Sequence, residues 1–346
     1  MGSFRRKKVG IAMMDMVEKL KQKVLSGERI GKEEAMVLYE APLEQLCQSA
    51  DEIRKHFCEN IFDICTIING KSGRCSEDCK YCAQSAHYPT KVEEYPLLSK
   101  EEIVTWAKYN DEKGVLRYSI VTSGKTLSDQ EVEELCETVR QIRKETEIAV
   151  CASLGLLKEE QFQKLKDAGV SRIHNNLETS KRNFKNICTT HTYEDKIKAI
   201  RSAKKVGLSV CSGGILGLGE TIEDRIDLAL SLRELGIRSV PVNVLNPILG
   251  TPYENQTPLT MEEVRRAVAV FRFLLPDASI RLAGGRGLLE DKGRSCFTSG
   301  ANAVISGDML TTAGITVDND LNMIEELGYR KELWDDERYF HHRNRD

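Results

Sequence analysis

The chain has 346 residues and a formal net charge of −3, because lysine and arginine are nearly balanced by aspartate and glutamate. This balance leaves no basic surplus to bind nucleic-acid phosphates, and the longest apolar stretches are shorter than the ~20 residues of a membrane-spanning helix. We therefore expect neither a nucleic-acid nor a membrane partner. Eleven cysteines, an odd number for a disulfide framework, favour a reducing, cytoplasmic environment with metal-bound thiols.

Helix-like and strand-like segments alternate along the chain. Residues 1–50 are predicted to form an N-terminal helical extension. β-rich runs follow at 61–68, 117–123, 148–154, 171–178, 208–216, 239–245, 279–284 and 301–307. Amphipathic helices are predicted at 99–113, 128–145, 158–168, 192–206, 221–235 and 260–275. Eight strands separated by helices predict an α/β fold, a closed (β/α)8 TIM-type barrel, rather than an open doubly wound sheet. The barrel would span 51–325, followed by a polar C-terminal tail at 326–346.

A loop after the first predicted strand carries three cysteines in the run RCSEDCKYC. They are Cys75, Cys79 and Cys82, in the spacing C-x3-C-x2-C. A four-iron cluster takes four thiolates, so three leave one iron open to a small molecule. The alternatives are buried structural thiols or a zinc knuckle, which needs a further Cys or His pair, and His87 is the one nearby candidate. The spacing is the signature of radical S-adenosylmethionine (SAM) enzymes, in which SAM binds the open iron of a 4Fe-4S cluster.

Three further cysteines fall in odd-numbered strands of the predicted barrel. Cys65 lies in the first, Cys151 in the third and Cys211 in the fifth. Alternate strands of a barrel contribute to the same interior layer, so the three thiols are expected to converge inside it. Packing as small core residues is the alternative for any one of them.

Polar residues occupy other strands of the same barrel. Asn176 and Glu178 share a face with His174 in the fourth strand, Asn243 lies in the sixth and Arg281 in the seventh. Such groups inside a barrel are costly unless they bind a ligand or one another. They predict a polar ligand pocket, with a structural hydrogen-bond network as the alternative. The glycine-rich run CSGGILGLGET would let a ligand approach the backbone, or it is a packing turn, and it lacks the Lys-Ser/Thr of a phosphate loop.

With these residues in view, the chain resembles the biotin synthase family of radical SAM enzymes from about Asn60 to Thr312. The resemblance rests on NGKSGRCSEDCKYCAQSAHY, HNNLETS, VCSGGILGLGET, VPVNVL, RLAGGR and CFTSGANAVISGDMLTT. It implies a 4Fe-4S cluster on the three loop cysteines. The implied SAM contacts are Tyr81, Asn176, Glu178, Lys196, Gly213 and Glu220. The implied contacts to the substrate, dethiobiotin, are Asn176, Asn243, Thr311 and Thr312.

The family also carries an auxiliary cluster, normally 2Fe-2S, on three cysteines and one arginine. Ser119 stands where the family has one of these cysteines, whereas this chain has thiols at Cys65 and Cys188 where the family does not. Iron in a sulfide cluster prefers thiolate to a hydroxyl. We therefore expect a rebuilt auxiliary cluster without Ser119, on Cys65, Cys151, Cys211, Cys188 and Arg281. Four thiolates would favour a four-iron type, and simple packing of the two additional thiols is the alternative.

The resemblance implies a sulfurtransferase that inserts sulfur into dethiobiotin to form biotin. SAM would be cleaved at the first cluster, and the auxiliary cluster would supply the sulfur, so that the cofactors carry the chemistry and no side chain is itself catalytic. An electron donor such as flavodoxin or ferredoxin and a homodimer are also implied. Two alternatives remain. One is another radical SAM barrel such as a hydrogenase-maturation protein, against which Asn243 and the Thr311–Thr312 pair argue. The other is a non-catalytic iron–sulfur electron carrier, which needs neither an open iron nor a large polar pocket.

Overall fold

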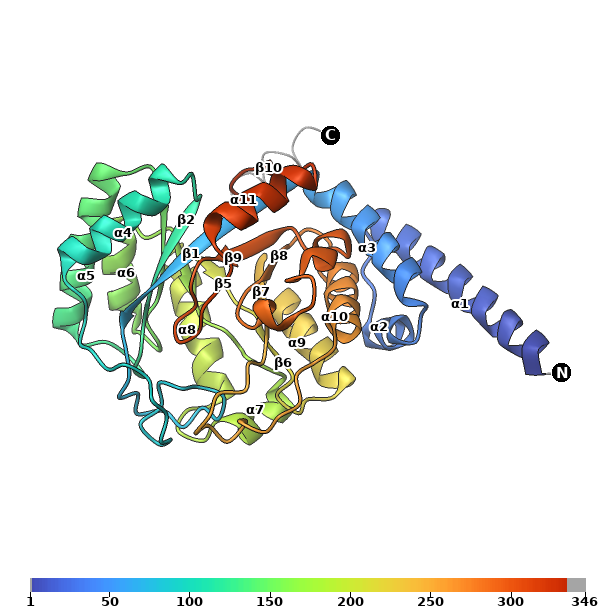
Figure 1. Cartoon of the computed structure of the whole chain (residues 1–346), viewed down its shortest axis with the longest axis horizontal. Coiled ribbons are helices and arrows are strands. Elements are labelled where there is room, and N and C mark those ends of the chain that lie inside the picture. The colour runs from blue at the N-terminus through green and yellow to red at the C-terminus, as the bar shows by residue number, and fades with distance from the viewer. Residues whose placement is uncertain (1, 335–346) are drawn as a thin grey trace.

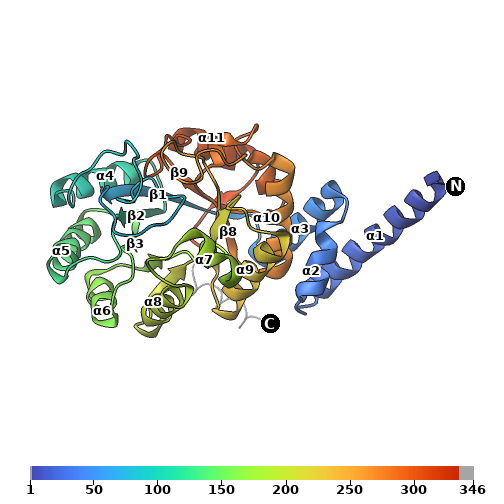
Figure 2. The ribbon, with the colours of Figure 1, turned by 90° about the horizontal axis from the view of Figure 1, so that it is seen from below.

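The computed structural model describes residues 2–334, with side chains described from residue 13 onward. The helical extension consists of α1 (Gly2–Leu25), α2 (Lys32–Tyr39) and α3 (Leu43–Cys58). Helices α2 and α3 pack against α9 and α10 of the main body, whereas α1 runs away from it (Figures 1 and 2). Of the predicted C-terminal tail, 335–346 lie outside the described residues.

The main body is a closed, entirely parallel barrel (Figure 1). The strand order is β1-β2-β3-β4-β5-β7-β8-β9, and pairing of β9 with β1 closes the ring. β6 pairs with β7 and continues the course of β5 after a break, so both lie within one predicted strand. The eight-stranded TIM-type barrel predicted from the sequence is thus confirmed. The strands are β1 (Ile61–Lys71), β2 (Arg117–Thr122), β3 (Ala149–Ser153), β4 (Arg172–His174), β5 (Ser209–Cys211), β6 (Gly214–Leu216), β7 (Ser239–Val244), β8 (Ser279–Leu282) and β9 (Ala303–Ser306).

Helices surround this ring, as Figure 2 shows from below. Several begin at a serine or threonine whose hydroxyl accepts a hydrogen bond from the first turn, as Thr192 and Thr221 do for α8 and α9. Such caps satisfy backbone N–H groups that have no partner within the helix. The helices are α4 (Lys100–Glu112), α5 (Asp129–Glu145), α6 (Glu159–Ala168), α7 (Lys181–Ile187), α8 (Tyr193–Lys205), α9 (Ile222–Glu234), α10 (Met261–Leu274) and α11 (Val317–Glu326). No helix among residues 2–334 has the length and apolar composition needed to cross a membrane.

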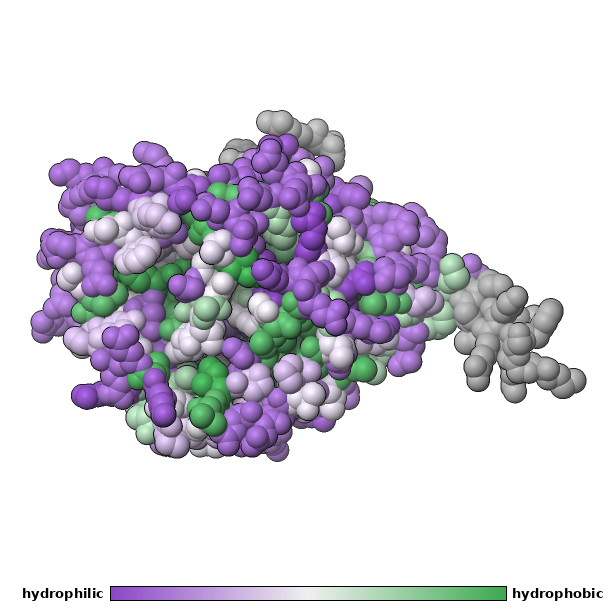
Figure 3. Space-filling model, in the orientation of Figure 1, coloured by the Kyte–Doolittle hydropathy of each residue, from purple (hydrophilic) through white to green (hydrophobic). Residues whose placement is uncertain are grey.

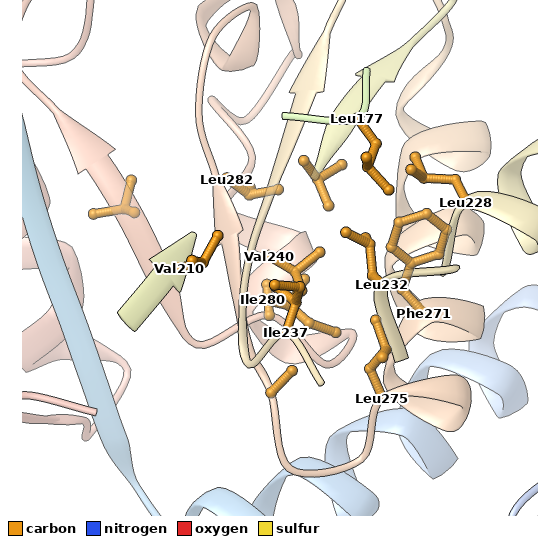
Figure 4. Close-up of a cluster of buried hydrophobic side chains, with 14 of the residues drawn as sticks. Leu177, Val210, Leu228, Leu232, Ile237, Val240, Phe271, Leu275, Ile280 and Leu282 are labelled. Carbon is orange, nitrogen blue, oxygen red and sulfur yellow. The ribbon is translucent and has the colours of Figure 1, made fainter. Parts of the chain in front are cut away.

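The hydrophobic core lies between the strands and these helices. Val240 of β7 and Ile280 of β8 are register partners whose side chains are fully buried. Figure 4 shows them beside Leu232 of α9 and Phe271 of α10. Because side chains alternate along a strand, the residues between these outward positions point into the barrel. In β7 and β8 those inward positions include Asn243 and Arg281, with Pro241 as an apolar exception.

The last described segment closes the amino-terminal end of the barrel. β10 (Arg330–Lys331) pairs with the start of β1, and Trp334 is buried just beyond it. The carbonyl of Trp334 accepts hydrogen bonds from Arg172 at 3.1 Å and Arg117 at 3.4 Å. This segment therefore anchors two side chains that reach into the barrel interior.

Candidate active site and cluster-binding cavity

A cavity of about 340 Å³ occupies the inside of the barrel. In Figure 3, neutral and hydrophobic residues gather around the centre of the face shown, and hydrophilic residues dominate its rim. The cavity lining includes most of the residues predicted from the sequence. These are Cys65, Tyr81, Cys151, Asn176, Glu178, Lys196, Cys211, Asn243, Arg281, Thr311 and Thr312, together with Ser119. The barrel thus brings the polar groups and the odd-strand cysteines to one enclosed space.

The three loop cysteines follow β1 on a tightly folded segment. The backbone N–H of Cys75 donates to the carbonyl of Gln84 at 2.9 Å, and its carbonyl accepts from Ala86 at 2.8 Å. The N–H of Cys82 donates to the carbonyl of Cys79 at 2.9 Å, which closes a turn between these two ligands. All three thiols are free and partly exposed. A pinned loop that carries three cysteines outside disulfide bonds fits a cluster that keeps one iron open.

The strand-four segment and the glycine loop are built around one another. The side-chain oxygen of Asn176 accepts from the N–H of Gly213 at 3.0 Å. A Cβ at Gly213 would lie 1.9 Å from the carbonyl oxygen of Pro241, so only glycine fits there. Gly213 is therefore needed for backbone packing, and its N–H is already used by Asn176. The expected contact of Gly213 with SAM stays a prediction, because Gly213 lies behind the cavity lining.

Glu178 has an unusual backbone conformation for its residue type, with φ of 69°. Its carbonyl and N–H are held by Ile215 at 2.8 Å and Gly213 at 3.0 Å, which fix this conformation. The carboxylate faces the cavity, and its Oε2 is buried without a hydrogen-bond partner among the described residues. A buried carboxylate oxygen of this kind needs a donor from a ligand. The hydroxyl and ammonium groups of SAM would supply one, so this side of the cavity fits SAM.

Two other residues of the predicted SAM site have distinct positions. Lys196 of α8 lines the cavity. Glu220 does not line it, and accepts instead from the N–H of Gly217 at 2.9 Å and from Arg225 at 2.7 Å. Glu220 therefore braces the glycine loop from behind. A direct contact between Glu220 and SAM is not what this arrangement favours.

The predicted substrate residues lie toward β7 and β9. The amide of Asn243 donates to the carbonyl of Gly214 at 3.0 Å and accepts from the N–H of Gly284 at 3.0 Å. One N–H and one lone pair of this amide remain for a ligand. Thr311 is exposed and Thr312 is half-buried, and both border the cavity. A urea at one end of a ligand and a carboxylate at the other would find matching groups here.

Three thiols from three strands lie deeper in the cavity. Cys65, Cys151 and Cys211 are all buried, and burial together with the nearby Cys151 raises the pKa of Cys65. The hydroxyl of Ser239 donates to the sulfur of Cys211 at 3.1 Å. Ser119 lines the same cavity as the register partner of Cys151. Geometry alone would thus permit Ser119 to approach a cluster, and the choice between it and Cys65 depends on ligand chemistry.

A buried group of charges, which we call the Asp63–arginine cluster, lies at the amino-terminal end of this cavity. It comprises Asp63, Arg117, Arg172 and Arg281, each at most 4% exposed. A carboxylate oxygen of Asp63 lies 2.9 Å from Arg117, 3.2 Å from Arg281 and 3.8 Å from Arg172. Burial would raise the pKa of Asp63, but the three guanidinium groups outweigh it and lower that pKa to about 2. Asp63 is therefore ionised throughout the neutral range.

This cluster contains one carboxylate for three guanidinium groups. An excess of buried positive charge is costly unless anions lie nearby. Thiolates and sulfide are such anions, and Nη2 of Arg281 has the Asp63 carboxylate as an ion-pair partner at 3.2 Å but makes no hydrogen bond among the described residues. The residues at this end of the cavity therefore fit an anionic iron–sulfur cluster held by the three barrel thiols.

Cys188 does not join the barrel thiols. It ends α7 outside the cavity lining, and its sulfur lies beside that of Cys79 in the cluster loop. The hydrogen bond between these two groups raises the pKa of Cys79 and lowers the pKa of Cys188 to about 4. The expected role of Cys188 as an auxiliary-cluster ligand stays a prediction, and this placement beside the loop of Cys79 does not favour it. Cys188 lies on a connection between helices, and its position in the sequence does not predict which part of the barrel that connection contacts.

Asp63, Arg117 and Arg172 were not predicted from the sequence. Each lies two residues before an interior position, and side chains two apart share one face of a strand. Asp63 stands two positions before Cys65, Arg117 two before Ser119 and Arg172 two before His174. Alternation within the strands was therefore the signal that could have found them. Burial lowers the pKa of His174 to about 4, so its ring is neutral at pH 7.

Comparison with known proteins gives a consistent result. The chain matches the family model of the radical SAM superfamily over residues 70–232 and that of the biotin and thiamin synthesis associated domain over residues 241–330. It is 60% identical to biotin synthase of Brachyspira hyodysenteriae over 320 residues, which is 92% of this chain and 96% of that protein. The chain belongs to the biotin synthase family. Biotin synthase of Akkermansia muciniphila is 58% identical over 91% of this chain and 98% of its own length.

Solved structures similar to this one share its fold. Methylornithine synthase aligns with a TM-score of 0.79 at 20% identity, over 91% of this chain and 97% of its own. The hydrogenase maturase HydG from Carboxydothermus hydrogenoformans aligns with a TM-score of 0.78 at 17% identity, over 95% and 82%. At such identities the likeness concerns the barrel alone, so it gives no support to a hydrogenase-maturation function. Family membership implies SAM, a 4Fe-4S cluster and an auxiliary iron–sulfur cluster as cofactors.

Proposed function

We propose that this member of the biotin synthase family converts dethiobiotin to biotin, with Cys75, Cys79 and Cys82 holding the SAM-binding cluster. The observation that carries the proposal is the shared cavity. One side of it presents the unpartnered Oε2 of Glu178, and its deep end presents three buried thiols beside the Asp63–arginine cluster. The bound cofactors supply one-electron cleavage of SAM, hydrogen abstraction from carbon and the sulfur that is inserted.

The chain's own residues would orient the ligands and exclude water. Tyr81, Asn176, Glu178 and Lys196 would border SAM, with Gly213 and Glu220 shaping the loop behind it. Asn243 would bind the urea group of dethiobiotin through the free donor and acceptor of its amide, and Thr311 and Thr312 would meet its carboxylate. Neutral amides and hydroxyls suit this substrate, because they pair with a urea without introducing charge. The closed barrel wall keeps solvent from the reacting carbon.

We propose that Cys65, Cys151 and Cys211 hold the auxiliary cluster, with Arg281 alongside. Three strands place these thiols around one end of the cavity, whereas Ser119 offers a harder oxygen that must first lose a proton. Without Cys188, the proposed auxiliary cluster has three thiolate ligands. Counting the irons of each cluster by Mössbauer spectroscopy on anaerobically prepared protein would distinguish a two-iron from a four-iron auxiliary cluster.

The deciding assay is anaerobic turnover with SAM, dethiobiotin and a low-potential reductant. Formation of biotin together with deoxyadenosine and methionine supports the proposal. Cleavage of SAM with no biotin would assign a different substrate, and absence of both in protein with intact clusters would reject the activity.

We also propose a homodimer in the cytoplasm that is reduced by a flavodoxin or ferredoxin. All eleven cysteines are free thiols, which suits a reducing compartment. Light scattering of the purified protein tests the dimer. Turnover with purified flavodoxin or ferredoxin and its reductase in place of a chemical reductant tests the donor.

A further inference from the structure

A second constellation of metal-ligating groups lies beside the SAM-cluster loop. Glu77 and Cys79 come from that loop, and Cys188 and His191 come from the connection between α7 and α8. The two segments are fastened together by backbone hydrogen bonds. The N–H of Lys80 donates to the carbonyl of Ile187 at 2.9 Å. The position of the four side chains is therefore fixed by the fold.

The ligand atoms of Cys79, Cys188 and His191 all lie within 4.8 Å of one another. Around a tetrahedral zinc ion, with bonds of about 2.0–2.3 Å, ligand atoms are separated by roughly 3.3–3.8 Å. The sulfur of Cys188 lies 3.3 Å from Nδ1 and 3.8 Å from Nε2 of His191, so both ring nitrogens are at about that separation. Cys188 and His191 are 3% and 7% exposed, so both are held in place by packing. Only small movements are needed to bring the three atoms around one ion.

Glu77 contacts the same imidazole through Nδ1. Its Oε2 lies 2.6 Å from Nδ1 of His191 and also accepts from the hydroxyl of Thr190 at 2.9 Å. A carboxylate that accepts the Nδ1 proton leaves the Nε2 lone pair free for a metal. Carboxylate–histidine pairs of this kind accompany metal-bound histidines, because they fix the tautomer and the ring orientation. The hydrogen bond thus orients His191 as a ligand.

We propose that Cys79, Cys188 and His191 bind a single transition-metal dication when the SAM cluster is absent, and that zinc bound there blocks assembly of the cluster. Two sulfur ligands and one imidazole select zinc, cobalt or ferrous iron over magnesium or calcium. Zinc binds such a set more tightly than ferrous iron does. The blocking step rests on the proposed function, since it requires Cys79 to be a cluster ligand, whereas the binding step does not.

The binding step is tested with Co²⁺ and cluster-free protein under anaerobic conditions. A background with all three barrel thiols replaced, Cys65→Ser, Cys151→Ser and Cys211→Ser, removes their contribution to cobalt binding. The background protein is expected to bind one cobalt with thiolate-to-metal charge-transfer absorption, displaced by zinc. Cys188→Ser and His191→Asn should each weaken cobalt binding at least ~10-fold, and Glu77→Gln by ~10-fold or more through the orientation of His191.

Matched controls locate the metal. Cys75→Ala and Cys82→Ala should leave cobalt affinity within about twofold, as should Cys136→Ala, which removes a buried thiol of α5. Circular dichroism of each cluster-free variant checks its folding. If either Cys188→Ser or His191→Asn fails to fold, the other of these two variants carries the test. If cobalt affinity is unchanged in Cys188→Ser and in His191→Asn but is lost in Cys75→Ala, the metal is bound by the loop thiols and the proposed site is wrong.

The blocking step is tested by rebuilding the cluster from iron and sulfide with one equivalent of zinc. Wild-type protein should lose most of its cluster absorption, whereas Cys188→Ser, which retains all three loop cysteines, should largely recover it. Equal inhibition of the two proteins would reject the block even where cobalt binding supports the site. Neither result depends on whether the loaded protein makes biotin.

Discussion

Nη2 of Arg281 lies 3.2 Å from a carboxylate oxygen of Asp63, in a position where both side chains are almost wholly buried. Nη1 of the same guanidinium donates to the carbonyl of Val304 at 2.9 Å and to that of Asp63 at 3.2 Å. Arg281 is thus held as a cation by the amino-terminal end of the barrel. In the proposed arrangement it would counter the charge of an auxiliary cluster, and the thiols would supply the firmest bonds to iron.

The proposed ligands of the auxiliary cluster are tested by replacing the thiol of Cys65 with a hydroxyl and by removing the hydroxyl of Ser119. Cys65→Ser should lose the absorption of the auxiliary cluster and block biotin formation while SAM cleavage continues at the intact first cluster. Ser119→Ala should be nearly silent in the same assays, because iron in a sulfide cluster prefers thiolate to a hydroxyl. Ser119 bound to iron in a crystal structure, with Cys65 packed against its neighbours, would reverse this assignment.

Replacement of Cys75, Cys79 or Cys82 by alanine should abolish SAM cleavage and leave the fold intact. Each change removes one of three thiolates from a short loop that has no further cysteine. Deoxyadenosine production and circular dichroism are measured side by side. Normal deoxyadenosine production by any one of the three variants would contradict the cluster assignment.

Asn243→Ala should weaken dethiobiotin binding by roughly 1–3 kcal/mol, the usual cost of leaving a buried polar group unpaired. Because Asn243 also holds the backbone of Gly214 and Gly284, some loss of stability is expected as well. Calorimetry measures dethiobiotin and SAM separately. SAM affinity without substrate should change little, and equal losses for both ligands would show that Asn243 acts through the loops alone.

Asp63→Asn should lower the free energy of unfolding by about 3–5 kcal/mol, because it leaves three buried guanidinium groups without their carboxylate. Asp318→Asn is the matched control, since its pair with Lys113 is exposed and is worth at most ~1 kcal/mol. Urea unfolding of the cluster-free proteins measures both. A small effect of Asp63→Asn would show that the arginines are neutralised by other groups.

The contribution of Asp63 to the free energy of unfolding should also depend on pH. The pKa of Asp63 is lowered in the folded protein to about 2, from 3.8. The carboxylate therefore stabilises the fold fully above about pH 4, and this stabilisation is lost as pH falls toward 2. The difference in stability between wild type and Asp63→Asn should be constant from pH 7 to about 5 and shrink below pH 4. A difference that grows on acidification would contradict the assignment.

The fold was predictable because the alternation of β-rich runs and amphipathic helices can be recognised in short stretches of sequence. Each of the eight predicted β-runs contains a strand, and the cysteines of odd strands share a cavity, as parity in a barrel requires. The break between Cys211 and Gly214 was not predicted, since it arises where Gly213 must pack against Pro241 of the next strand. This constraint arises from a tertiary contact, and its one trace in the sequence is the glycine at position 213.

The site was predictable where strands carry the residues and less so where loops do. Arg281 and Asn243 line the cavity because alternation along a strand fixes their direction. Cys188 lies on a loop, and its approach to Cys79 depends on how two connections of the barrel fold against each other. Glu220 was expected at the ligand, yet a hydrogen bond to its own loop and an ion pair with Arg225 take up its carboxylate.

Among residues 2–334, the buried Trp334 segment and the arginines that it anchors cover the amino-terminal end of the barrel. Whatever reaches the deep thiols must pass through the space that SAM and the substrate later occupy. With the auxiliary cluster on these thiols, loading would be sequential, and the cluster would be installed before either small molecule. If that cluster is consumed as the sulfur source, its repair must wait until the product has left. Turnover number would then be governed by how quickly the cavity empties and is refilled with iron and sulfide.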